Sequence, residues 1–203
     1  MKDWTLFLPS VQPEVAACPP PIAIQAIRDT AIDFCAESKI WQEVQPAYFL
    51  TPGLVSYPLE ADAGTRVYQI VEAQVAGREL GVLTPETCDR LFHGWRLGLA
   101  GTPEAVTQMQ PEEFCVLPQP TVTTQLILTV ILGPTRDSTQ GPDFLFNDYY
   151  DALCSGAKAR LLLMRGTIWA DPQQGLAYAA VAANAITRAR ERRTSVFGQG
   201  SKA

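Results

Sequence analysis

The sequence has 203 residues, of which 47% are hydrophobic and 18% charged. This composition favours one domain, or a main domain with a modest insertion, and argues against a disordered, collagen-like or coiled-coil protein. The net charge of −5 is unevenly distributed. Residues 188–203 hold five cations and one carboxylate, a net charge of +4, so residues 1–187 carry −9. An acidic chain with a short basic end is expected to be soluble, but this charge distribution does not identify a binding partner.

No membrane span or export signal is expected. The longest apolar run, about residues 126–132, is far shorter than the ~20 residues that cross a bilayer. Asp3 and Pro9 interrupt any apolar run near the N-terminus. The five cysteines are widely spaced and include no Cys-x-x-Cys pair, which predicts buried, reduced thiols.

Residues 1–18 are expected to form an extended N-terminal arm, because Pro9 and Pro13 interrupt a helix there. Large apolar side chains on this arm are candidate anchors for docking onto another surface. The anchors are Trp4, Phe7 and Leu8.

A helix is predicted from Pro21 to about residue 40, because proline is tolerated at the first helical position and apolar residues then recur at helical spacing. Three carboxylates outside the apolar stripe are spaced four residues apart and form one acidic line. They are Asp29, Asp33 and Glu37. This line is interpreted as either a solvated face or a contact with a neighbouring subunit.

Prolines, glycines and short β-rich pieces characterise residues 41–141. The expected strands are residues 48–50, 66–76, 114–117 and 121–132. A turn after Val75 leads into a partner strand, and Thr84 is expected to cap a short helix that ends near Phe92.

Helices are predicted again at 143–164, with Asp143 as the cap, and at 172–194. Gly156 in the first of these predicts close packing against another helix. The predicted fold class is α+β, a bundle of three to four helices with an inserted antiparallel β-sheet or sandwich. The predicted domains are the arm, a helical bundle, a β-rich insertion and a flexible tail. Their ranges are 1–18, 19–40 with 142–195, 41–141, and 196–203.

Few residues suggest catalysis. His93 is the single histidine, so a site with several histidine ligands is excluded. Either of two groups would support a small enzyme: the pair Cys88 and His93, or the carboxylates Asp148 and Asp151. Ordinary structural roles explain both groups, and Asp143 nearby is explained as a helix cap. We therefore expect no enzyme activity, no metal and no cofactor.

The last helix ends in a group of arginines that has three interpretations: favourable interaction with the helix dipole, docking to a protein, or contact with nucleic acid. The group comprises Arg188, Arg190, Arg192 and Arg193.

Short motifs stand in order along nearly the whole chain. They are Leu8-Pro9-Ser10-Val11, Cys18-Pro19-Pro20, the run 26–38 with Trp41, Tyr57-Pro58-Leu59, Gly94-Trp95, Asp148-Tyr149-Tyr150, the run 156–162, and Trp169-Ala170-Asp171-Pro172 before an alanine-rich helix. In this order and spacing they resemble the head-to-tail adaptor (connector) proteins of tailed bacteriophages.

The resemblance implies a structural protein of the virion neck or tail, made in the host cytoplasm. Copies of the chain would form a ring, expected to be dodecameric, below the portal protein. The ring would extend the DNA channel without sequence-specific DNA binding, and it would provide a docking platform for a tail or nozzle protein.

The resemblance also implies that the C-terminal segment clamps the portal. Its expected contact residues are Arg188, Arg190, Arg192, Arg193, Val196 and Phe197. Asp29, Asp33 and Glu37 are expected to face a neighbouring subunit or the basic last helix. The alternatives are another neck or tail subunit, or a nucleic-acid-binding module that uses the basic helix.

Overall fold

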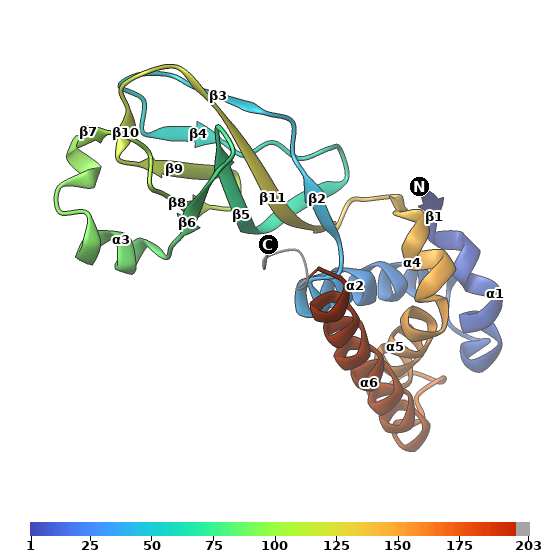
Figure 1. The fold of residues 1–203 in the computed structure, drawn as a ribbon. Coiled ribbons are helices and arrows are strands. Elements are labelled where there is room, and N and C mark those ends of the chain that lie inside the picture. Colours follow the sequence, from blue (N-terminus) through green and yellow to red (C-terminus); the bar gives the residue numbers. More distant parts are fainter. Residues whose placement is uncertain (198–203) are drawn as a thin grey trace. The chain divides into compact units, whose positions relative to one another are not determined.

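The structure is a computed structural model that describes residues 1–197, with side chains through Arg193. The chain divides into two compact units (Figure 1). We call residues 1–40, 63–65 and those from 133 onward the helical unit, and residues 41–62 and 66–132 the strand unit.

The helical unit consists of helices and one two-stranded sheet. Its elements are β1 (Lys2–Asp3), the 3₁₀ helices η1 (Trp4–Phe7) and η2 (Gln12–Val15), and α1 (Leu8–Val11), α2 (Pro20–Ser38), β12 (Gln140–Gly141), α4 (Asp143–Asp148), α5 (Tyr150–Leu162) and α6 (Pro172–Phe197). β1 and β12 pair antiparallel. The helices predicted near α2 and α6 are confirmed.

The prediction of an extended N-terminal arm is wrong, because η1, α1 and η2 follow one another along residues 4–15. Pro9 and Pro13 stand at the starts of α1 and η2, where a backbone N–H has no helical partner to lose. Trp4 and Phe7 are each 1% exposed. The segment is therefore part of the helical core.

The helix predicted over 143–164 is interrupted at Tyr149, whose φ of −127° and ψ of 18° separate α4 from α5. Asp143 is also not the cap. Pro142 occupies that position, and the Asp143 carboxylate lies 2.8 Å from the amino group of Met1.

Helix α5 meets α2 and α6 at Gly156. A Cβ atom at this position would overlap the methyl group of Thr30 and would lie 3.6 Å from the Cβ of Ala182. Thr30 is held in place because its hydroxyl donates a 2.7 Å hydrogen bond to the carbonyl of Ala26. The close packing that the sequence predicted at Gly156 is thus confirmed.

The strand unit is built on an eight-stranded sheet. Its strands are β2 (Gln42–Val44), β3 (Tyr48–Leu50), β4 (Ser56–Pro58), β5 (Thr65–Val75), β6 (Arg78–Val82), β8 (Ala105–Gln110), β9 (Glu113–Leu117) and β11 (Thr124–Pro134). The order is β2-β11-β5-β6-β8-β9-β4, with β3 also paired to β11. Most described pairs are antiparallel, but β6 and β8 run parallel.

Apolar residues from these strands form one core, in which the rings of Tyr57 and Phe114 stack with 5.5 Å between their centroids. An excursion between β6 and β8 carries α3 (Pro85–Leu91), η3 (Trp95–Leu97) and β7 (Ala100–Gly101). β7 pairs in parallel with β10 (Gln119–Pro120). The hairpin predicted after Val75 is confirmed, and its two turn residues, Ala76 and Gly77, both have positive φ.

The predicted fold class is wrong. Residues 1–197 have a mixed α/β fold, with a large curled sheet of eight strands and six α-helices. They do not form a helical bundle with an inserted antiparallel sheet or sandwich, and the large sheet includes the parallel pair β6–β8. The strands β2 and β4 have three residues each and lie near prolines, so they are too short to show the alternation of apolar and polar residues that predicts a strand. The parallel β6–β8 pair depends on the long connection between the two strands, which local sequence patterns do not reveal.

Among residues 1–197, no helix is both long and apolar enough to cross a membrane.

The contact at Gly156 predicts a specific stability change. Gly156→Ala should lower the free energy of unfolding by roughly 1–3 kcal/mol, because the added methyl group overpacks the contact with Thr30. The helical preference for alanine offsets only about 1 kcal/mol of this loss. Urea denaturation followed by circular dichroism measures the change.

Thr30→Ser supplies the matched control, because serine removes the obstructing methyl group and keeps a hydroxyl for the Ala26 carbonyl. The double variant should regain most of the loss. Equal stability of Gly156→Ala and the unmodified protein would contradict the steric argument.

Candidate functional site

The C-terminal end of α6 carries the arginines that the sequence singled out. Arg188 and Arg192 are exposed, whereas Arg193 is half-buried. Arg190 is exposed but anchored, because its Nε donates a 2.9 Å hydrogen bond to the backbone carbonyl of Glu37 on α2. The side chains of Val196 and Phe197 lie outside the described residues, as do residues 198–203. Arg188 and Arg192 therefore place exposed positive charge near the end of α6.

The acidic line on α2 lies beside arginines of the same chain. Asp33 forms an ion pair with Arg160 of α5, and Arg190 of α6 reaches the Glu37 backbone. Asp29 is half-buried, while Asp33 and Glu37 are exposed. The one carboxylate of the line with a described ion pair is Asp33, whose partner is on α5, while the described hydrogen bond from the last helix reaches the backbone of Glu37.

A groove of about 500 Å³ runs between α2, α5 and α6. Small residues make up much of its lining, where the three helices approach closely. Among these are Ala152, Gly156, Ala159, Ala179, Ala182 and Ala183. Charged residues also line the groove, namely Asp33, Glu37, Arg160 and Arg190. The lining therefore combines small residues with charges of both signs.

The candidate anchors of the N-terminus pack inside the helical unit. The indole Nε1 of Trp4 donates a 3.1 Å hydrogen bond to the Ser138 carbonyl. The ring of Phe7 stacks on Tyr150 with 5.0 Å between centroids, and Leu8 is half-buried. These side chains hold the fold of their own chain.

The residues weighed as catalytic do not form an activated site. Cys88 is fully buried, and this burial raises the pKa of its thiol, which is the opposite of what a nucleophile requires. His93, Asp148 and Asp151 are exposed. All five cysteines are free and buried, as the sequence predicted. Within residues 1–197, no group of three or more histidine, cysteine or acidic side chains could hold a metal ion.

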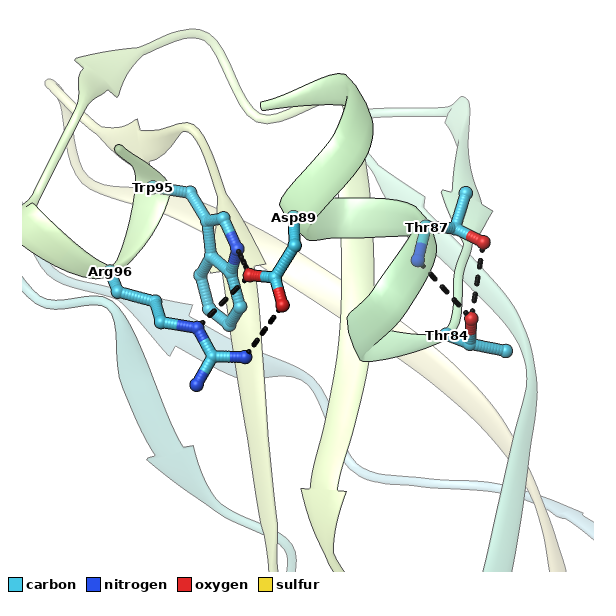
Figure 2. Close-up of polar contacts among 5 residues, drawn as sticks. All are labelled: Thr84, Thr87, Asp89, Trp95 and Arg96. Atoms are coloured by element: carbon cyan, nitrogen blue, oxygen red, sulfur yellow. Dashed lines mark hydrogen bonds and ion pairs between the residues drawn. The ribbon is translucent and has the colours of Figure 1, made fainter. Parts of the chain in front are cut away.

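A polar cluster in the excursion of the strand unit was missed by the sequence analysis (Figure 2). Asp89 Oδ1 accepts hydrogen bonds from Trp95 Nε1 at 2.9 Å and Arg96 Nε at 3.0 Å, and Oδ2 accepts from a terminal nitrogen of Arg96 at 3.0 Å. The guanidinium also lies over the Trp95 ring, 4.9 Å from its centroid. The spacing of Asp89 and Arg96 resembles no standard helical pair, so only the fold could reveal it.

The same excursion begins at a capped helix and presents an exposed leucine. Thr84 accepts a 3.4 Å hydrogen bond from the Thr87 N–H and so caps α3, as predicted (Figure 2). The Asp89 cluster fixes η3, and Leu97 at the end of η3 is 92% exposed.

The described residues thus present a basic helix end, a groove between three helices and an exposed leucine, and they show no activated catalytic group. A family model described as SU10 adaptor protein matches residues 7–201. The chain belongs to this family of phage head-to-tail adaptor proteins, which confirms the resemblance read from the sequence. Among the curated proteins compared with the chain, none matches it.

Family membership establishes the general role. The chain is a structural protein of a bacteriophage and a component of the virion. An adaptor has portal and tail proteins as its partners in general.

The Asp89 cluster predicts a pH-dependent signal. The hydrogen bonds from Arg96, and after them the bond from Trp95, hold the pKa of Asp89 below its ordinary value of 3.8. The stabilisation is therefore present above pH 3.8 and is lost as the pH falls through the lowered pKa. We expect the Trp95 indole N–H resonance in NMR to shift with a midpoint below pH 3.8.

Asp89→Asn should abolish this titration. The Trp4 indole, which donates to a backbone carbonyl, should not shift in the same range and serves as the internal control. A Trp95 midpoint at or above pH 3.8 would refute the proposed bonding.

Proposed function

We propose that the chain forms a ring of identical subunits below the portal, extends the DNA channel and provides the platform on which the tail docks. Family membership supports the general adaptor role. Heterologous contacts, in which two different surfaces of one chain meet, generate such rings. The acidic line on α2 and the groove beside it supply one candidate surface for a neighbouring copy.

The C-terminal segment from Arg188 is proposed as the portal-binding element. The observation that carries this proposal is that Arg188 and Arg192 are exposed near the end of α6, in a chain whose residues 1–187 carry a net charge of −9. Arg190 is used differently, since it joins α6 to α2. Exposed arginines would steer the subunit toward an acidic portal surface, with a rate and affinity that fall as salt rises.

The isolated subunit is proposed to be monomeric or weakly associated, with the ring forming on the portal. Residues 1–187 carry −9, so like subunits repel at low salt. The portal would overcome this repulsion by holding neighbouring copies side by side. DNA would pass through the resulting channel without sequence-specific contacts.

Charge reversal tests the role of the exposed arginines. The double variant Arg188→Glu, Arg192→Glu should bind portal rings about tenfold or more weakly, because each exposed ion pair contributes ~0–1 kcal/mol and reversal adds repulsion. Co-sedimentation with purified portal at two salt concentrations measures the effect.

Arg165→Glu is the matched control, because Arg165 is also an exposed arginine of the helical unit but lies between α5 and α6. It should bind like the unmodified protein. If the double variant and Arg165→Glu lose affinity equally, general charge and not the end of α6 governs binding.

Removal of residues 194–203 tests whether apolar contact from Val196 and Phe197 adds to the arginines. Burial of one such aromatic side chain is worth ~1.5–3 kcal/mol, so the truncated chain should bind portal at least tenfold more weakly, with its salt dependence retained. Undiminished binding in the same co-sedimentation assay would remove this segment from the interface.

A further inference from the structure

A groove opens in the strand unit where β5 and β6 part. The described β5–β6 ladder covers Ala73–Val75 and Arg78–Leu80. Beyond Leu80, β6 continues in parallel with β8, pairing Gly81 with Ala105. The earlier part of β5 therefore faces β8 across a groove of about 370 Å³. This volume is at the lower end of the ~300–1,000 Å³ typical of ligand pockets.

Inside this groove, the side chain of Gln108 accepts a hydrogen bond that a neighbouring strand would accept in a continuous sheet. The backbone N–H of Ile70 on β5 donates a 3.2 Å hydrogen bond to the side-chain Oε1 of Gln108 on β8. In a continuous sheet, this N–H would bond to the backbone carbonyl of an adjacent strand. The amide oxygen of Gln108 thus stands where the carbonyl of an added strand would stand. It satisfies a backbone group that burial would otherwise make costly.

The walls of the groove are uncharged, although the strand unit as a whole carries a net charge of −6. The lining is apolar at Ile70, Val82, Leu83, Pro85, Met109 and Pro111, and polar but neutral at Tyr68, Gln69, Thr84, Gln108 and Gln110. A charged segment entering the groove would lose its hydration and find no opposite charge. The geometry and the lining together favour an extended, uncharged stretch of polypeptide.

We infer that the groove between β5 and β8 accepts an extended, uncharged segment of the tail-side protein as an added strand along β5. A backbone carbonyl of this segment replaces Gln108 Oε1 at the Ile70 N–H, and its apolar side chains pack against Ile70 and Met109. The inference rests on the proposed function, in which the end of α6 contacts the portal and another surface is left for the tail. Strand addition supplies affinity through the backbone and selectivity through the side-chain lining.

Blocking the groove in the full-length chain tests the inference. Met109 lines the groove and is 37% exposed, so Met109→Arg places a charge there without emptying the core. Val122 is 67% exposed on the same unit and does not line the groove, so Val122→Arg is the matched control. Purified tail protein of the same phage is the probe. Met109→Arg should bind it at least tenfold more weakly, and Val122→Arg should bind it unchanged.

Hydrogen exchange separates strand addition from an indirect effect. Tail protein should slow amide exchange at Ile70 and the adjoining residues of β5 in the unmodified chain. Gln108→Ala should raise the exchange rate at Ile70 in the free chain, and tail protein should restore its protection. Unchanged exchange on β5 with tail protein bound, or equal binding by Met109→Arg and Val122→Arg, would overturn the inference.

Binding to portal rings is measured for the same variants, because it tests the proposed function separately. If all variants bind portal, and Met109→Arg binds tail protein as well as Val122→Arg does, the groove inference is overturned while the proposed function stands. Failure of the unmodified chain to bind either protein would overturn both.

Discussion

The absence of a side chain at Gly156 is the constraint on which the helical unit depends. Because α5 presents no Cβ there, Thr30 of α2 and Ala182 of α6 approach the same point of its backbone. Helices this close share small residues and leave little room for large side chains between them. Nearer the end of α6, Arg190 donates a hydrogen bond to the Glu37 carbonyl, which adds a second link between α6 and α2.

Burial of the N-terminal segment narrows the choice of contact surfaces. The indole of Trp4 bonds to the Ser138 carbonyl, and its ring fills the space that a side chain at Gly141 would need. Phe7 stacks on Tyr150 in the same unit. To bind another protein, these rings would have to leave a core that gains about 1.5–3 kcal/mol from each. Near the end of α6, by contrast, the side chains of Arg188 and Arg192 are exposed.

Long, regular segments could be predicted from the sequence, and the features set by distant contacts could not. Proline at the first turn and helical spacing predicted α2, and the small residues of α5 predicted its close packing. The opposite rule, that proline interrupts a helix, gave the wrong prediction at Pro9 and Pro13, because each proline is the second residue of a short helix. The parallel pairing of β6 with β8, and the bonds that join Asp89 to Trp95 and Arg96, depend on how the excursion closes. Nothing in their local sequence encodes that closure.

The two proposed contacts differ in the physical force that holds them, and this difference suits an adaptor. The end of α6 relies on exposed charges, whose attraction is screened over ~8–10 Å at physiological salt and acts mainly on the encounter. The groove beside β5 has an uncharged lining, so backbone hydrogen bonds and apolar burial would hold its occupant largely independently of salt. An acidic strand unit of net charge −6 would repel like-charged segments, while its groove still admits a neutral one. One chain can therefore distinguish two partners by charge before any detailed fit is made.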